Sequence, residues 1–173
     1  MSVQNACQER DSVHPTSPVS EADISPFTEH DLDAVRGLFG EYASSLTVDL
    51  GFQSFDEEVA ALPGGYAPPT GALLVARVGG EPVGCVALLR IDPETCELKR
   101  LFLRPAHRGG GSGLRLLEAA VAEARRLGYH RLRLDTIPEM QRAQALYERY
   151  GFREIEPYRR NPVAGARFLE LEL

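Results

Sequence analysis

A run of glycines between two regular elements is the part of this sequence best suited to bind a ligand. Residues 108–113 read Arg-Gly-Gly-Gly-Ser-Gly and lie between an apolar, strand-like run (98–103) and a long amphipathic segment (114–127). Glycines leave the backbone N–H groups of a turn unshielded, and the first turn of a helix adds unpaired N–H groups and the positive end of its dipole. A strand, a glycine turn and a helix N-terminus together predict an anion site, most often for phosphate or pyrophosphate.

Two common phosphate-binding motifs do not fit this turn. A P-loop ends in Gly-Lys-Ser or Gly-Lys-Thr, whereas here the last glycine is followed by Leu-Arg. The dinucleotide fingerprint G-x-G-x-x-G also fails, because no third glycine stands at the required spacing. The pattern that fits is R-x-x-G-x-G, with Arg108, Gly111 and Gly113. Five cations close in sequence favour an anionic ligand for the turn: Lys99, Arg100, Arg104, Arg108 and Arg115.

Length and composition restrict the class of protein. A chain of 173 residues, with 43% hydrophobic and 25% charged residues, fits one well-buried soluble domain. The net charge of −6 argues against a broad nucleic-acid-binding surface. The three cysteines lack C-x-x-C spacing, so no metal site or disulfide framework is expected. No membrane span or secretory signal is visible, and we expect a cytoplasmic location without membrane contact.

The pattern along the chain predicts a disordered tail over residues 1–21 and one domain over residues 22–173. Thr28 is a plausible N-cap for a first helix reaching Tyr42, and a short helix follows over residues 55–62. Strands are predicted over residues 72–78, 83–91 and 97–103, the first two joined by a Gly-Gly hairpin turn. After the glycine turn we expect a helix (114–127), a strand (132–135), a helix (139–150) and two strands (152–156 and 167–173). This order predicts a mixed sheet with helices on its faces.

With these motifs in place, the sequence resembles the GNAT superfamily of acyl-CoA-dependent N-acyltransferases. The resemblance runs from about Ile24 to the C-terminus and is densest between Glu97 and Phe152. It is carried by residues 97–105 (ELKRLFLRP), by the R-x-x-G-x-G turn and by residues 143–152 (AQALYERYGF). It implies an α/β (α+β) fold with a mixed, mostly antiparallel sheet of about six to seven strands and about four helices.

The resemblance also implies where acetyl-CoA binds. The turn's backbone amides would hold the pyrophosphate, and the preceding strand would offer its backbone to the pantetheine arm and the acetyl carbonyl. The implied pyrophosphate residues are Arg108, Gly109, Gly110, Gly111, Ser112 and Gly113. The implied pantetheine residues are Leu101, Phe102 and Leu103. No metal is implied, and a structural turn without a ligand is the alternative.

Tyr147 is the expected acid that protonates the departing thiolate. It stands at the position of the acid in the family's Y-x-x-x-G-F pattern, with Gly151 and Phe152. A phenol titrates near ~10 and a thiol near ~8.5, so a tyrosine is a reasonable donor to a thiolate. The alternative is a core aromatic, because Leu146, Tyr147 and Tyr150 share one side of a short helix.

Glu97 is the expected base for the acceptor amine, since some family members use a glutamate at the start of this strand. The alternative is a carboxylate that pairs with Lys99, its same-face neighbour at i+2. Asp135, at the end of a strand, is another candidate polar group. The sequence departs from the family at Met140, where many members carry Asn, so any polar contact from there is absent or moved to Gln141 or Gln144.

The acceptor side is the least similar region. The N-terminal helices and the last strand pair offer Tyr42, Phe52, Phe55, Tyr66, Tyr158, Asn161 and Arg167. Residues 157–162 form a proline-rich loop whose arginines could favour an acceptor that carries a carboxylate.

The sequence thus predicts an N-acetyltransferase in which a small-molecule or protein amine attacks acetyl-CoA directly, without an acyl-enzyme. The partners are acetyl-CoA and the amine, with a possible homodimer and no nucleic acid. A non-catalytic acyl-CoA sensor and a generic nucleotide-binding domain are the alternatives.

Overall fold

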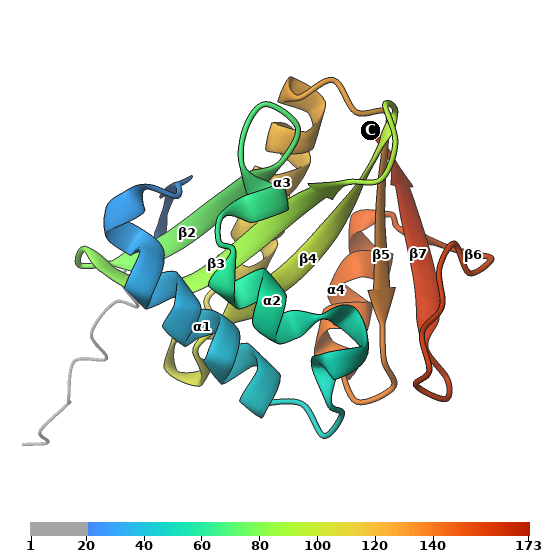
Figure 1. The fold of residues 1–173 in the computed structure, drawn as a ribbon, viewed down its shortest axis with the longest axis horizontal. Coiled ribbons are helices and arrows are strands. Elements are labelled where there is room, and N and C mark those ends of the chain that lie inside the picture. Colours follow the sequence, from blue (N-terminus) through green and yellow to red (C-terminus); the bar gives the residue numbers. More distant parts are fainter. Residues whose placement is uncertain (1–20) are drawn as a thin grey trace, which may run out of the picture.

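A seven-stranded sheet forms the middle of the molecule, with the strand order β1-β2-β3-β4-β5-β7-β6 (Figure 1). The computed structural model describes residues 21–173, so the predicted tail lies outside them apart from Glu21. Neighbouring strands are antiparallel except for β4 and β5, which are parallel. The strands are β1 (Asp23–Pro26), β2 (Ala72–Val78), β3 (Glu81–Arg90), β4 (Thr95–Leu103), β5 (Arg131–Thr136), β6 (Arg153–Ile155) and β7 (Arg167–Glu172).

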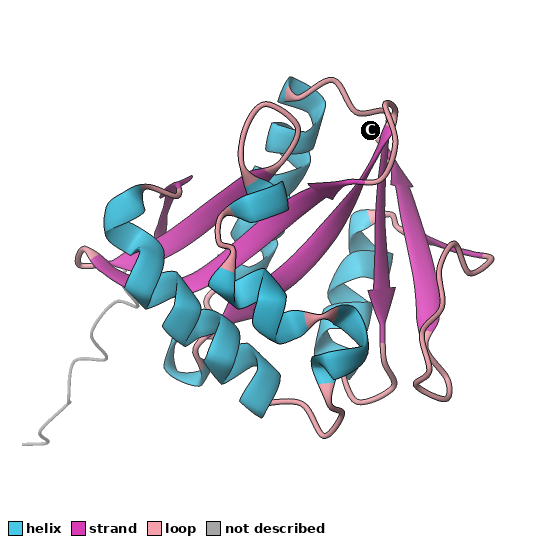
Figure 2. Ribbon diagram, viewed as in Figure 1, coloured by secondary structure: helices cyan, strands magenta, loops and turns pink. Residues whose placement is uncertain are grey.

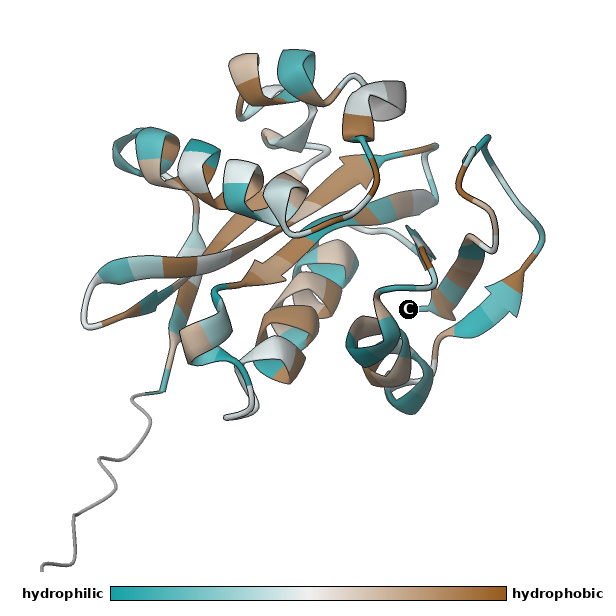
Figure 3. Cartoon of the chain, turned by 90° about the horizontal axis from the view of Figure 1, so that it is seen from below, coloured by the Kyte–Doolittle hydropathy of each residue, from teal (hydrophilic) through white to brown (hydrophobic). Residues whose placement is uncertain are grey.

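Four α-helices cover the two faces of the sheet. They are α1 (Leu32–Ser44), α2 (Phe55–Ala60), α3 (Ser112–Arg126) and α4 (Gln141–Tyr150). Helices α1 and α2 lie on one face, and α3 and α4 lie on the other (Figures 2 and 3). This arrangement confirms the mixed α/β fold with a mostly antiparallel sheet. Among residues 21–173, no helix combines the length and the apolar character needed to cross a membrane.

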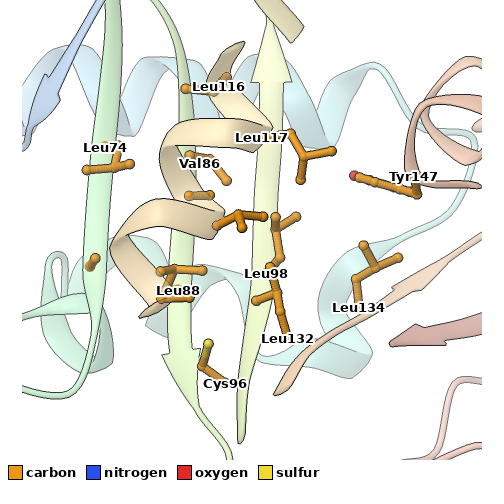
Figure 4. Packing of buried hydrophobic residues seen from close by; sticks show 14 of the residues in the cluster. Leu74, Val86, Leu88, Cys96, Leu98, Leu116, Leu117, Leu132, Leu134 and Tyr147 are labelled. Atoms are coloured by element: carbon orange, nitrogen blue, oxygen red, sulfur yellow. The ribbon is translucent and has the colours of Figure 1, made fainter. Parts of the chain in front are cut away.

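The two faces of the sheet have separate apolar cores. Leu74, Val86 and Leu98 pack with α3 in one core (Figure 4), while Val75 and Phe102 pack with α1 in the other. Because β2 and β3 are covered on both faces, their sequences are almost continuously apolar instead of alternating.

The predicted elements are present, one strand was missed, and several elements have ends shifted by about two residues, two helices among them. Strand β1 was not predicted, because it has four residues, includes Pro26 and lies at the sheet edge against β2. Helix α2 is shorter than expected and ends at Ala60, before the Pro63–Gly64 segment. Helix α3 begins at Ser112, two residues early, so the glycine turn includes the first helical residues.

The central strands β4 and β5 separate soon after they start. They pair only at Thr95–Arg131, Cys96–Leu132 and Glu97–Arg133, although β4 continues to Leu103. On its far side β5 is paired with β7 along its whole length. The backbone of β4 beyond Glu97 therefore faces a gap in the middle of the sheet instead of a neighbouring strand.

A β-bulge in β4 determines on which face of the sheet its side chains lie. Between the pairs Ala87–Lys99 and Cys85–Phe102, β4 contains one residue more than β3. Arg100 takes a left-handed conformation (φ 56°), which is uncommon for a non-glycine residue. As a result Lys99 and Arg100, although consecutive, both face the α1–α2 side of the sheet, where they contact Glu97 and Glu58.

Candidate active site

The glycine turn presents free backbone donors at the start of α3. The first intrahelical hydrogen bond runs from Arg115 N–H to Gly111 O (3.1 Å), so the N–H groups of residues 112–114 have no intrahelical acceptor. Gly109 and Gly111 have φ angles of 93° and 82°, which favour glycine. The turn can therefore bind an anion without any side chain.

Gly113 differs from these two glycines. Its φ is not left-handed, and an added Cβ would make ordinary contacts of 3.9 Å with Leu103 and Leu146. The fold itself thus does not require glycine here, whereas close approach of a ligand to the backbone would. Arg108 folds back from the turn, and its Nε donates to Leu103 O (2.7 Å) while its guanidinium lies 5.5 Å from the Phe102 ring centroid.

A cavity of about 50 Å³ occupies the gap between β4 and β5 and is called the β4–β5 cavity below. Its walls include residues 98–101 of β4, residues 134–136 of β5, and Tyr42, Met140 and Tyr147. The implied pantetheine residue Leu101 is on this wall. Phe102 and Leu103 lie further along β4 and are buried in the two cores.

Tyr147 reaches this cavity from α4. Figure 4 shows its ring extending toward β4, with the hydroxyl end in the direction of Leu98 and Leu117. The side chain is 3% exposed, and within residues 21–173 no hydrogen bond joins its hydroxyl to another residue. Burial raises the pKa of Tyr147, with smaller contributions from Tyr42 and Asp135. The phenol is therefore protonated at neutral pH and able to donate.

Glu97 lies in a cluster of charged and polar side chains beside the cavity, called the charge cluster below. Its carboxylate accepts from Tyr158 Oη (2.7 Å) and lies 3.0 Å from the guanidinium of Arg159. Arg159 also donates to Asp135 (2.5 Å), which accepts from Asn161 Nδ2 (2.7 Å). The cluster thereby fastens the proline-rich loop to β4 and β5.

Lys99 completes the charge cluster. Its Nζ lies 3.8 Å from Glu97 Oε2, so the ion pair expected from the i+2 spacing is present. Burial lowers the pKa of Lys99, and the charge of Glu97 only partly opposes this effect. Both Lys99 and Arg159 also line a second cavity, so they stand at the junction of two hollows.

The second cavity, called the α2 cavity below, has a volume of about 510 Å³ and lies under α2 and residues 63–66. One wall is held by a buried ion pair, in which Arg100 donates to both oxygens of Glu58 (2.9 and 2.6 Å). Tyr66 Oη also donates to Glu58 (2.6 Å), and the guanidinium of Arg100 lies 5.1 Å from the Phe55 ring centroid. Helix α2 is thus attached to the bulge of β4.

Some predicted residues make other contacts than expected. The expectation that five cations flank the glycine turn is wrong for Lys99 and Arg100, because the bulge directs them to the α1–α2 face. Arg167 pairs with Glu148 and Glu154 on the surface. Gln144, considered as a substitute at the Met140 position, donates to Ile137 O (2.7 Å) instead. The side chain of Phe52 lies outside the described part of the chain.

Sequence reasoning did not single out three residues of the site: Glu58, Arg159 and Thr136. Glu58 meets Arg100 across 42 positions, and Arg159 meets Glu97 across 62. No local spacing signals such contacts, although the arginines of the proline-rich loop were noted as a group. In the described chain, no group of three or more His, Cys, Asp or Glu residues is placed to hold a metal ion.

Comparison with known sequences identifies the family of the chain. Residues 35–152 match the sequence model of the acetyltransferase (GNAT) family. An uncharacterized N-acetyltransferase of Schizosaccharomyces pombe is 39% identical over 145 residues, covering 83% of this chain and 89% of the relative. An uncharacterized N-acetyltransferase of Escherichia coli is 34% identical over 125 residues, covering 70% and 74%.

Solved structures share the fold. A crystal structure of an acetyltransferase from Streptococcus agalactiae superposes with a TM-score of 0.73 at 25% identity, over 88% of this chain and 98% of that one. A GNAT acetyltransferase from Elizabethkingia anophelis, solved with acetyl-CoA bound, has the same fold with a TM-score of 0.60 at 23% identity, over 88% and 99%.

The chain belongs to the GNAT acetyltransferase family. It is accordingly an acetyltransferase enzyme of the N-acetyltransferase class, which confirms the predicted family, fold and reaction class. The two non-enzymatic alternatives, a sensor and a generic nucleotide-binding domain, are not supported.

Proposed function

We propose that the two cavities divide the reacting groups, with the thioester end of acetyl-CoA reaching into the β4–β5 cavity and the amine in the α2 cavity. The observation that carries this proposal is the gap beside β4, which ends at the protonated hydroxyl of Tyr147. The free N–H groups of residues 112–114 and Gly109–Gly111 would hold the pyrophosphate. Leu101, Phe102 and Leu103 would then border the pantetheine arm.

The chemistry follows from this placement. The neutral amine nitrogen forms a bond to the carbonyl carbon of the thioester, the carbon–sulfur bond breaks, and the electron pair leaves on sulfur. The nitrogen then loses one proton, which the thiolate takes up by way of Tyr147, so that the amide and the free thiol are the products. Tyr147 donates a hydrogen bond to this thiolate, since its raised pKa keeps the phenol protonated. Cys96 is buried in the core on the opposite face of β4 from Glu97, so a direct attack in a ternary complex needs no acyl-enzyme.

Glu97 is proposed to receive the proton of the acceptor ammonium through the charge cluster. Both of its oxygens are already engaged, by Tyr158, Arg159 and Lys99, so a proton reaches it by way of these partners or a water. The same residues line or adjoin the junction where the amine would meet the thioester. While Glu97 is protonated, the ion pair between Arg159 and Asp135 would still hold Arg159 in place.

The α2 cavity is the proposed acceptor site because it meets the β4–β5 cavity at Lys99 and Arg159. Its lining combines the acids Glu57 and Glu58 and the base Arg160 with apolar residues such as Pro63 and Leu89, so it suits an amine that carries both polar and apolar groups. A volume of about 510 Å³ accommodates a small molecule or the end of a polypeptide.

Release of free thiol from acetyl-CoA in the presence of a panel of amines tests this function. The panel should contain apolar amines, polyamines, amino acids and peptides with a free N-terminus. We expect thiol release to rise above the slow background hydrolysis with at least one polar amine. Mass spectrometry should find the acetyl group on the amine and none on the protein; an acetylated cysteine would contradict direct attack.

A substitution at Gly113 tests the placement of the pyrophosphate. Gly113→Val should raise the Kd of acetyl-CoA about tenfold or more, because the added methyl groups block close approach to the free N–H groups. Gly37→Val in α1, where an added Cβ meets open space, is the control and should leave the Kd unchanged. Equal affinities in the two variants would place the ligand elsewhere.

Three wider expectations remain proposals. The described cysteines Cys85 and Cys96 are free and buried, which fits a reducing, cytoplasmic setting. We retain the division into a tail (1–21) and one domain (22–173). The homodimer is tested by light scattering coupled to gel filtration.

A further inference from the structure

Thr136, the last residue of β5, holds a buried hydroxyl without a partner. The residue is 2% exposed, and its Oγ1, fully enclosed by the described residues 21–173, has no hydrogen-bond partner among them. Buried hydroxyls nearly always have a partner, because losing water without replacement costs stability. Valine has the same shape and an even better fit to a strand, so the hydroxyl needs an explanation.

The place of Thr136 suggests what the missing partner is. Its side chain lies on the same face of β5 as Leu132 and Leu134, the face on which Tyr147 is buried. It lines the β4–β5 cavity, whose nearby wall is apolar at Leu98, Leu134 and Met140. Polar side chains line the cavity as well, but no hydrogen bond joins any of them, the Tyr147 hydroxyl included, to Thr136 Oγ1. A molecule that enters the cavity can supply the missing partner.

The backbone of β4, on the other side of the cavity, indicates which class of molecule can bind there. Beyond Glu97, β4 presents its edge to the gap without a strand opposite it. An elongated ligand with alternating amide groups suits such an edge, since it can pair with the strand as another strand would. The pantetheine arm of acetyl-CoA has two amides and ends in the thioester carbonyl. Each offers a carbonyl oxygen that a threonine hydroxyl can donate to.

We propose that Thr136 is a binding residue for acetyl-CoA, its hydroxyl donating to a carbonyl of the pantetheine arm or of the thioester. This inference rests on the proposed placement of the thioester end of acetyl-CoA in the β4–β5 cavity. In this proposal β5 contributes a side-chain contact to the ligand, in addition to the backbone contacts that β4 offers. It also explains why an orphaned hydroxyl is retained, since its cost in the free enzyme is recovered when the ligand binds.

Thr136→Val separates this role from a structural one. Removing an unpaired hydroxyl should leave the melting temperature of the free enzyme unchanged or higher, while the Kd of acetyl-CoA rises about three- to tenfold. Thr136→Ser should restore the affinity. Thr95→Val is the matched control, because Thr95 is buried in the same sheet and its Oγ1 accepts from Arg131 Nε (3.2 Å). That variant should lose stability and keep its affinity.

The ligands used distinguish the two kinds of carbonyl. If Thr136→Val weakens free CoA and acetyl-CoA equally, the contact is to an amide; if it weakens acetyl-CoA alone, the contact is to the thioester. Unchanged affinity for both ligands, or a change only in the KM of the amine, would overturn the inference. The Gly113→Val variant separates failure of the Thr136 inference from failure of the proposed acetyl-CoA site. If the site is correct, Gly113→Val binds acetyl-CoA more weakly, whether or not Thr136 contacts the ligand.

Discussion

The glycine turn offers its ligand backbone N–H groups, whereas the α2 cavity offers charged side chains that are already paired with one another. In the turn, Gly109 and Gly111 shape the chain and α3 supplies the dipole. In the cavity, Glu58 is bound by Arg100, and Arg159 is shared between Glu97 and Asp135. A backbone site is the same for every sequence with that turn, while a site of paired side chains can be changed one residue at a time. In the proposed placement of the substrates, this difference would let the cosubstrate site stay constant while the acceptor site varies.

The largest effect is expected from removing the hydroxyl of Tyr147, the proposed acid for the departing thiolate. Tyr147→Phe should lower kcat about 10²-fold or more and leave the Kd of acetyl-CoA nearly unchanged, because only proton donation to the thiolate is lost. Tyr150→Phe, on the same helix and packed against Phe152, is the matched control and should keep its activity. Normal turnover of the Tyr147→Phe variant would show that Tyr147 is only a core aromatic residue and not the acid.

The second prediction concerns the ion pair that attaches α2. Glu58→Gln leaves the guanidinium of Arg100, whose side chain is 3% exposed, without its counterion. We expect a loss of about 3–5 kcal/mol in the free energy of unfolding, measured by urea denaturation. Glu41→Gln breaks a similar two-pronged pair with Arg104, but that pair is about 40% exposed, and its loss should cost less than ~1 kcal/mol.

The same pair predicts a dependence of stability on pH. Burial alone would raise the pKa of Glu58, but the hydrogen bonds and charge of Arg100 lower it overall. A carboxyl whose folded pKa is depressed stabilises the fold above its unfolded pKa of about 4.3, and this contribution is lost as the pH falls through the folded value. Between pH 5 and pH 3, the wild-type protein should therefore lose more stability than Glu58→Gln does. Parallel losses would show that Glu58 does not titrate as described.

The third prediction asks whether the charge cluster moves a proton or only holds the loop. If Glu97 accepts the proton of the acceptor, Glu97→Gln should reduce kcat/KM about 10²-fold at pH 7 and much less at a pH where the amine is already neutral. A loss of the same size at every pH would assign Glu97 to positioning alone. Asp135→Asn is the comparison variant, because it also breaks a contact of Arg159 while leaving Glu97 in place.

Local features of the fold and site could be predicted from the sequence, and distant contacts could not. The turn at residues 109–113 and the pattern of Tyr147, Gly151 and Phe152 each lie within a few neighbouring residues, so both can be recognised in the sequence. The bulge at Arg100 carries no such mark, since nothing in the residue type signals a left-handed arginine. The pairing of Glu58 with Arg100 depends on a contact across 42 positions that exists only once the sheet has formed.

The early separation of β4 and β5 gives the sheet an unpaired edge in its interior, not only at its rim. Rim edges are exposed to other chains and are a hazard for aggregation. This inner edge lies between α1 and α2 on one side and α3 and α4 on the other, so another polypeptide strand has little access to it. A narrow ligand can reach this edge, whereas a strand of a second protein cannot. The domain can therefore keep unpaired backbone N–H and C=O groups available for a ligand without the risk that they cause aggregation.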